Sequence, residues 1–335
     1  MKRRLGIVFL VITMAVISSC VRDYSITMNF GAKKYFDSWV KVHCPDAKMT
    51  KLGAYIMEDE PGTGVLVGDV EEHPYIYLTY KTMDLDGNIA DYTDSTVAKQ
   101  MHEFNNSTYY GPKVLSRLNN NLNAGFEDVI KDMRVGGKRK AVVPGWLSVT
   151  DRYSTAQEYL DKCTGDDVIY ELEIVDAVLD ITQAQIDSIE RYLSHNLHKT
   201  DSTAWGFYYI QTCPPTDTTS FKPDDAVYIN YTGRLLNGKV FDTSVKDTAK
   251  RYGLDLAGSY NDIKIKIAEN YTDYTMGDGN SGGMIDGFSY CLSRMRTGEK
   301  GIAVFTSNHG YQGNDSEKIP AFSPLRFDIE MIGKK

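Results

Sequence analysis

The chain has 335 residues and a formal net charge of −8, with 42% hydrophobic and 24% charged residues. This apolar content excludes a disordered chain, and the length fits two domains of about 150 residues each. Nucleic acid and anionic lipid bind to basic patches, which an acidic composition does not favour, so neither is an expected partner. The sequence contains no metal-ligand spacing, phosphate-binding glycine loop, HExxH or GxSxG, so we expect no metal and no cofactor.

The N-terminus has the pattern of an export signal. Three basic residues (2–4) precede an apolar run at 5–16, which is shorter than the roughly 20 residues of a membrane span but typical of a signal peptide. The run ends at Ile17-Ser-Ser-Cys20, which resembles a bacterial lipobox. We therefore expect a signal peptide at 1–19, lipidation of Cys20, and a lipid-anchored location in the cell envelope, on the periplasmic or outer-membrane face. The alternatives are an ordinary cleaved signal with a chance cysteine, or an uncleaved apolar N-terminus.

Loss of the leader takes three positive charges from a net of −8 and leaves about −11, so the membrane contact should come from the lipid alone.

The four cysteines after Cys20 are Cys44, Cys163, Cys213 and Cys291. Outside the cytoplasm they allow up to two disulfides, with no pairing given by the sequence. Cys291 falls on the apolar face of a predicted helix, where a buried free thiol is expected.

The chain contains the same unit twice. YKTMDLDGNIAD at 80–91 and YTGRLLNGKVFD at 231–242 share Tyr, Gly and Asp at an offset of 151. Residues 125–143 and 287–305 share eight positions at an offset of 162, and YELEI from 170 matches FDIEM from 327 at an offset of 157. Three blocks in the same order indicate a duplication with insertions and deletions in the loops.

Each unit has the same predicted elements. An alternating strand (75–80 or 226–231) precedes a hairpin turn at Asp86-Gly87 or Asn237-Gly238. A short helix follows, with apolar residues at spacings 0, 3, 4 and 7 from Phe126 or Phe288. Gly136 and Gly298 are expected to cap these helices at their C-terminal ends. Several strands around one helix predict an α+β fold with antiparallel sheets.

The predicted organisation has five parts. They are a signal peptide (1–19), a lipidated tether with a short helix at 30–43 (20–49), a first unit (50–178), a helical linker (179–201) and a second unit (202–335). The linker helix is predicted from an apolar face formed by Ile186, Ile189, Leu193 and Leu197.

Four segments of the second unit are distinctive together and in this order: NYTGRLLNGKVFDTS at 230–244, MIDGFSYCLSRMRTGEK at 284–300, the Tyr311 segment and IPAFSPLRFDIEM at 319–331. By these segments the second unit resembles the FKBP-type peptidyl-prolyl cis/trans isomerases. The resemblance implies an antiparallel sheet half-wrapped around the helix at Phe288, a shallow apolar pocket, and isomerase activity on proline-containing polypeptides. The implied catalytic residues are Tyr231, Phe241, Asp242, Ile285, Phe288, Tyr311 and Phe327, with Met284 and Ile319 contacting the substrate.

Taken singly, each of these aromatic residues is more often a plain core residue, and only their joint order favours a pocket. The resemblance implies that Tyr311 donates its hydroxyl to a substrate carbonyl and that the backbone N–H of Ile285 binds another. Asp242 would orient the site. Residues 245–283 form a longer insertion than is usual for the family, with a predicted strand from Lys264 and a mobile loop at 276–283. It could cover the pocket or narrow its substrate range.

The family places an aromatic pocket wall in this insertion, where Tyr271 and Tyr274 are alternatives.

The first unit lacks most of the implied site. Ala90 stands at the position of Phe241, Asn123 at that of Ile285, and VPGW at 143–146 replaces the Tyr311 loop, although Asp91, Phe126 and Tyr170 persist. We expect this unit to be catalytically weak or dead, serving as a spacer, a chaperone-like surface or a dimer interface.

Residues 84–88 (DLDGN) faintly resemble a calcium loop, but Ser95 stands at the twelfth position, so we expect a hairpin turn.

Two functions remain open. One is an isomerase that assists the folding of exported proteins through its C-terminal site. The other is a non-catalytic FKBP-like chaperone or assembly lipoprotein of the envelope. The sequence gives no oligomeric state.

Overall fold

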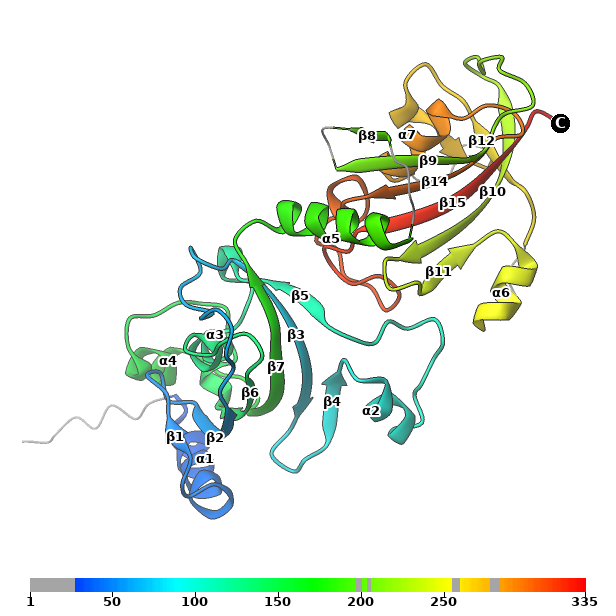
Figure 1. The fold of residues 1–335 in the computed structure, drawn as a ribbon. Helices are drawn as coiled ribbons and strands as arrows, with labels where there is room; N and C mark the ends of the chain where they lie inside the picture. Colours follow the sequence, from blue (N-terminus) through cyan, green and yellow to red (C-terminus); the bar gives the residue numbers. More distant parts are fainter. Residues whose placement is uncertain (1–27, 197–200, 204–205, 255–259, 278–283) are drawn as a thin grey trace, which may run out of the picture.

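The computed structural model describes residues 28–196, 201–203, 206–254, 260–277 and 284–335. The predicted signal peptide, Cys20 and residues 278–283 of the predicted mobile loop lie outside these ranges. Two antiparallel sheets, each packed beside a short helix, are joined by α5 (Ile181–Asn196) (Figure 1). The fold class is α+β, as predicted. None of the helices in the described ranges has the length and apolarity that a membrane crossing needs.

The N-terminal unit is built on one curved sheet. Its strands, in spatial order, are β1 (Lys48–Met49), β2 (Tyr55–Glu60), β6 (Lys138–Val143), β7 (Val168–Val178), β3 (Tyr75–Met83) and β4 (Ile89–Tyr92), with β5 (Lys113–Ser116) also paired to β3. Its helices are α1 (Phe30–His43), α2 (Ser95–Gln100), α3 (Ala124–Ile130) and α4 (Ala156–Lys162). The helix α1 spans the range in which the sequence predicts one.

The C-terminal unit repeats this plan. Its strands, in spatial order, are β13 (Thr275–Met276), β12 (Ile263–Lys266), β10 (Ala226–Leu235), β15 (Leu325–Gly333), β14 (Lys300–Phe305), β9 (Phe207–Cys213) and β8 (Asp201–Thr203), with β11 (Val240–Thr243) also paired to β10. Its helices are α6 (Lys246–Tyr252) and α7 (Asp286–Arg294). The order β2-β6-β7-β3 in one sheet matches β9-β14-β15-β10 in the other, as a duplication requires.

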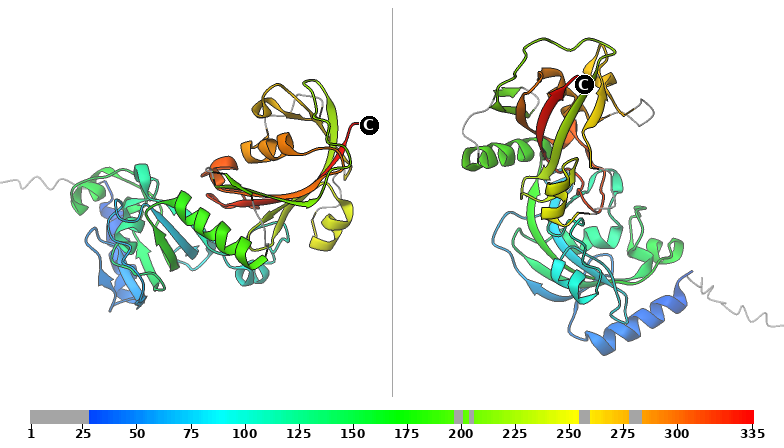
Figure 2. Two further views of the ribbon diagram at one scale, coloured as in Figure 1. Left: turned by 45° about the horizontal axis from the view of Figure 1, so that its top comes forward. Right: turned by 90° about the vertical axis from the view of Figure 1, so that its right-hand side faces the viewer.

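The inner face of the C-terminal sheet packs on α7. Phe288, Cys291, Leu292 and Met295, the four positions of the predicted apolar stripe, are each at most 3% exposed. On β15 every second side chain is buried, as a strand with one covered face requires. The sheet curves around α7 (Figure 2). Cys291 is buried and free, as the sequence predicts, and its burial raises the pKa of the thiol.

The predicted glycine caps are wrong. The helices α3 and α7 end at Ile130 and Arg294, several residues before Gly136 and Gly298. Both glycines have positive φ, at 83° and 78°. Their N–H groups donate to carbonyls of the last long strand of each unit, at 2.7 Å from Gly136 to Ile174 and 2.8 Å from Gly298 to Met331. These glycines therefore shape the turns that lead into β6 and β14.

The linker helix α5 packs on the outer face of the C-terminal sheet. Ile189 and Leu193 form a small apolar cluster with Tyr208 of β9 and with Ile302 and Val304 of β14. Leu197, the fourth residue of the predicted face, lies outside the described residues. The helix thus lies between the two sheets, as the two views of Figure 2 show.

The four described cysteines are free thiols. At the predicted calcium-like turn, the Asp84 carboxylate accepts backbone N–H groups of Asp86 and Asn88, each at 2.9 Å. This is the hydrogen bonding of a hairpin turn closed by an aspartate.

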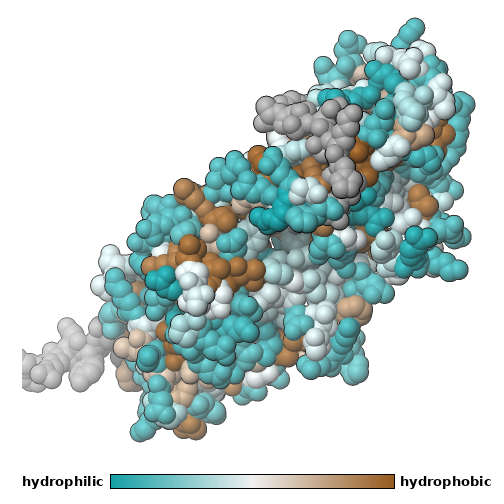
Figure 3. All heavy atoms as spheres, viewed as in Figure 1, coloured by the Kyte–Doolittle hydropathy of each residue, from teal (hydrophilic) through white to brown (hydrophobic). Residues whose placement is uncertain are grey.

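On the face seen in Figure 3, apolar residues form small groups among hydrophilic ones.

Candidate functional site

A β-bulge places the residue at position 241. In the pairing of β10 with β11, Gly233 faces Asp242 and Arg234 faces Val240, which leaves Phe241 as the extra residue. The pairing of β3 with β4 has the same irregularity, and there the extra residue is Ala90. Bulges redirect a side chain out of the regular alternation of a strand. The two units therefore have the same bulge, which carries the Phe241 ring in the C-terminal unit and the Ala90 methyl group in the N-terminal unit.

The predicted aromatic residues of the C-terminal unit form one cluster centred on Phe327. Its ring centroid lies 5.6 Å from Phe241, 4.9 Å from Phe288 and 6.2 Å from Tyr231. Phe241, Phe288 and Phe327 are only 3–4% exposed. A Cβ on Gly233 would lie 2.5 Å from the Phe241 ring, so a side chain there would displace it. The chain thus brings together, on strands and a helix, the four rings that the resemblance assigns to a pocket.

Polar groups lie at one edge of this cluster. The Tyr231 hydroxyl donates to Asp242 Oδ2 at 2.6 Å, and the backbone N–H of Thr243 donates to Asp242 Oδ1 at 2.9 Å. Burial and the neighbouring Asp242 charge raise the pKa of Tyr231. The same two causes raise the pKa of Tyr311, although 40% of its surface is exposed. Both phenols therefore stay protonated, as hydrogen-bond donors, at neutral pH.

The remaining predicted residues border the same core. Met284 and Ile285 immediately precede α7 and pack, partly buried, against the C-terminal core. Ile319 is 9% exposed and belongs to the core itself. His309 Nδ1 lies 2.8 Å from the Asp286 carboxylate, which joins the segment before Tyr311 to the first turn of α7.

The insertion contains the predicted strand, β12, which pairs with β10, and a helix, α6, that the sequence analysis did not predict. Both alternative aromatic walls pack against the C-terminal core. Tyr274 is 8% exposed, and the ring of Tyr271 lies 5.3 Å from that of Tyr290 on α7. The helix α6 follows β11, the strand that contains Phe241, just as α2 follows β4, the strand that contains Ala90.

The N-terminal unit keeps part of the arrangement. Tyr80 donates to Asp91 at 2.8 Å, and the rings of Phe126 and Tyr170 lie 5.0 Å apart. The difference is at Asn123, whose side chain caps α3 and donates to the Tyr170 hydroxyl at 3.0 Å. A hydrogen-bonded amide thus stands where the other unit has the apolar Ile285.

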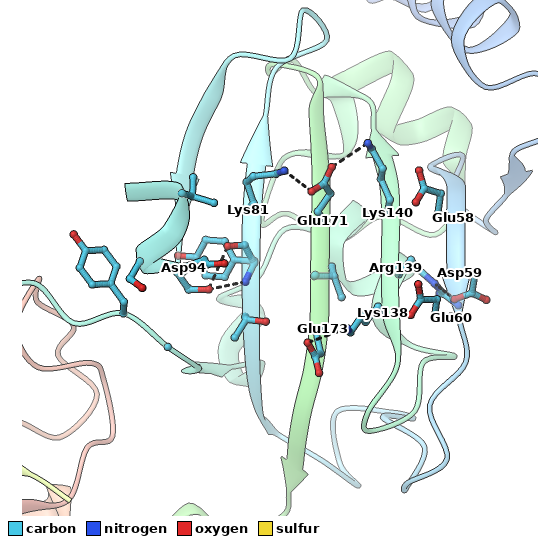
Figure 4. Close-up of a pocket in the computed structure, with 18 residues that line it drawn as sticks. Glu58, Asp59, Glu60, Lys81, Asp94, Lys138, Arg139, Lys140, Glu171 and Glu173 are labelled. Atoms are coloured by element: carbon cyan, nitrogen blue, oxygen red, sulfur yellow. Dashed lines mark hydrogen bonds and ion pairs between the residues drawn. The ribbon is translucent and has the colours of Figure 1, made fainter. Parts of the chain in front are cut away.

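A large groove lies away from the aromatic cluster. It has a volume of about 760 Å³ and lies on the N-terminal sheet, lined by many charged side chains (Figure 4). Lys81 and Lys140 both pair with Glu171, at 2.5 and 2.9 Å, and Arg139 pairs with Asp59 at 3.0 Å. None of the residues that the sequence predicts for the site lines this groove. We therefore assign the candidate site to the cluster around Phe327.

The second unit is thus an α+β domain in which a curved antiparallel sheet and one helix hold an aromatic cluster with a polar edge. Residues 217–332 match the family model described as FKBP-type peptidyl-prolyl cis-trans isomerase. FK506-binding protein 2 of Dictyostelium discoideum is 32% identical over 121 residues, which are 36% of this chain and 73% of that protein. The chain belongs to the FKBP-type peptidyl-prolyl cis-trans isomerase family.

Further proteins are similar to parts of the chain. FK506-binding protein 1A of Aspergillus fumigatus is 28% identical over 113 residues, covering 33% of this chain and 80% of that protein. Among solved structures, the three FKBP domains of wheat FKBP73 align over 84% of this chain and 94% of that chain, at 13% identity and a TM-score of 0.31. A peptidyl-prolyl isomerase from Pseudomonas syringae aligns over 46% of this chain and 96% of its own chain, at 23% identity and a TM-score of 0.31.

Proposed function

We propose that the chain isomerises X-Pro peptide bonds at the aromatic cluster of its C-terminal unit. The observation that carries this proposal is the matched pair of bulges. Both units place one residue out of register at the same point, and only the C-terminal unit puts a ring there, Phe241 against Ala90. Together with the amide of Asn123 in place of Ile285, this difference favours the C-terminal unit as the one with an apolar site.

The reaction suits such a site because no covalent bond is broken. The barrier of about 18–20 kcal/mol arises from amide resonance, which is lost when the bond twists. Water hydrogen-bonds the planar, charge-separated amide well, so an apolar surface that excludes water favours the twisted form. Proline-containing polypeptides are the proposed substrates.

Each side chain then has a role. Phe241, Phe288 and Phe327 contact the proline ring, with Met284 and Ile319 beside them. Asp242, held by Tyr231, orients the polar edge, and the Tyr311 hydroxyl donates to a substrate carbonyl. The backbone N–H of Ile285, at the start of α7, donates to a second carbonyl.

A matched pair of variants tests which unit is active. Tyr231→Phe and Tyr80→Phe each remove a hydroxyl that donates to an aspartate, at 2.6 and 2.8 Å. We expect Tyr231→Phe to lower kcat/KM for a proline peptide about fivefold, since one hydrogen bond to a charged group is lost at a partly exposed edge. Tyr80→Phe should leave it unchanged. Equal losses in both variants would contradict a single C-terminal site, and a folded wild-type chain without activity would leave a non-catalytic binding role.

We further propose that the protein works in the cell envelope, anchored by a lipid on Cys20, where it assists the folding of exported proteins. The support is the leader pattern and the lipobox-like Ile17-Ser-Ser-Cys20. The mass of the mature N-terminal peptide should correspond to a chain that begins at Cys20 and carries acyl groups, and Cys20→Ser should release the protein from membranes. A mature chain that begins elsewhere, or an unmodified Cys20, would contradict the anchor.

A further inference from the structure

The loop between β14 and β15 carries two residues of the candidate site, Tyr311 and Ile319. In Figure 1 this loop extends from the C-terminal sheet toward β5 of the N-terminal unit. Its residues bond to the linker helix and to the N-terminal unit at several points along its length. The loop is therefore held in part from outside the domain whose site it completes.

The first contact comes from the linker helix α5. Gln185, only 2% exposed, donates through Nε2 to Ser307 Oγ at 2.9 Å and accepts the backbone N–H of Ser307 through Oε1 at 2.6 Å. Next to it, Asn308 Nδ2 donates to Thr182 Oγ1 at 3.0 Å. Ser307 is 1% exposed, so its N–H depends on Gln185 Oε1 as its hydrogen-bond acceptor in place of water. These bonds fix the backbone four residues before Tyr311.

The second contact comes from the segment between α2 and β5, and from β5 itself. The backbone N–H of Tyr109 donates to the carbonyl of Glu317 at 2.6 Å, and the Tyr109 ring packs against the C-terminal core. Lys113 Nζ lies 2.9 Å from the Asp315 carboxylate. A crevice between the units is lined by Tyr109 and by Pro320 of the loop, among other residues. The N-terminal unit thus contacts the loop within the stretch that joins its two site residues.

The third contact involves a strained residue. Phe322 has φ +57°, a left-handed conformation that costs a side-chain-bearing residue about 1–2 kcal/mol. Its ring meets that of Tyr75 on β3 edge-on at 5.2 Å, and its N–H donates to the carbonyl of Gln312, which also has positive φ (54°). Such conformations persist when the surroundings hold them. The loop shape therefore depends on partners that include the N-terminal unit.

We propose that the linker helix and the N-terminal unit position the loop 307–322, and that Gln185 and Lys113 are positioning residues for the C-terminal site. The inference rests on the proposed isomerase function for its catalytic consequence. It gives the N-terminal unit a role that needs no active site of its own, which is to keep Tyr311 and Ile319 at the edge of the aromatic cluster.

The test uses the full chain with Gln185→Met and a matched control, Gln183→Met. Gln183 lies on the same helix but is exposed, and its side chain donates to Asp187 of that helix at 2.8 Å. We expect Gln185→Met to speed amide hydrogen exchange in 307–322 about tenfold and to lower kcat/KM about tenfold, since a buried donor loses its partner. The exchange of β10 and α7 should stay unchanged. Gln183→Met should alter none of these values by more than about twofold.

A second variant, Lys113→Met, removes the ion pair from the other side and should give a smaller change, about two- to threefold, because the pair is partly exposed. If Gln185→Met fails to fold, the exchange of 307–322 in Lys113→Met alone tests whether the loop is positioned from outside its domain. Unchanged exchange of 307–322 in the folded variants would overturn the inference. If the wild-type chain proves inactive, the proposed function fails, while the exchange data still decide whether the loop is positioned from outside its domain.

Discussion

A chain carrying Phe241→Ala is expected to isomerise an X-Pro peptide with about one thirtieth of the wild-type kcat/KM. The ring contacts Phe327 at 5.6 Å and stands at the bulge, where the N-terminal unit has alanine. Removing it takes about 2 kcal/mol of apolar contact from the enclosed substrate and lets water reach the twisting amide. A protease-coupled or NMR exchange assay on a proline peptide measures the change.

Two further variants separate this loss from a loss of folding. Phe241→Ala should also lower the free energy of unfolding by about 3–5 kcal/mol, because the ring is 3% exposed. Phe241→Leu keeps most of the apolar volume and should retain more activity and stability. Val240→Ala truncates the neighbouring buried residue and leaves the four rings intact, so it should destabilise the domain while keeping kcat/KM. Equal activity losses in Val240→Ala and Phe241→Ala would show that the ring has no special role.

The part of the site that the sequence predicts is the part that follows from short-range patterns. The stripe of Phe288, Cys291, Leu292 and Met295 repeats at helical spacing, and the structure buries all four. The hairpin turns recur in both units, and alignment of one copy against the other identifies Ala90 as the counterpart of Phe241. The duplicated chain therefore supplies an internal reference that a single unit lacks.

What the sequence could not predict depends on contacts between distant segments. Gln185 and Ser307 are 122 residues apart, and neither lies in a pattern that marks a buried hydrogen bond. The same applies to Lys113, which looks like an ordinary surface charge. Local signals assign Gly136 and Gly298 to helix ends, whereas their N–H groups bond to strands that come later in the chain. Tertiary partners decide these positions, and local propensity does not.

The second large effect is expected at Arg117, in the N-terminal unit. Its side chain is 1% exposed and pairs with Glu127 at 2.9 Å. It also donates to the backbone carbonyls of His73 at 2.9 Å and Gly68 at 3.0 Å, and so holds together the loop before β3 and the first turn of α3. Arg117→Met leaves these acceptors and a partly buried carboxylate without this donor. The N-terminal unit should lose about 3–5 kcal/mol of unfolding free energy.

Hydrogen exchange resolved by peptide measures this loss in each unit separately. Amides of β7 should exchange faster in Arg117→Met, while those of β15 keep most of their protection because the C-terminal core is built mainly from its own residues. Arg152→Met is the control, since Arg152 is exposed and its side chain donates to backbone carbonyls at the surface. If the loop 307–322 loses protection together with β7 while β15 does not, the N-terminal unit holds that loop. If β7 and β15 lose protection equally, the chain unfolds as one cooperative body and the division into two units is wrong.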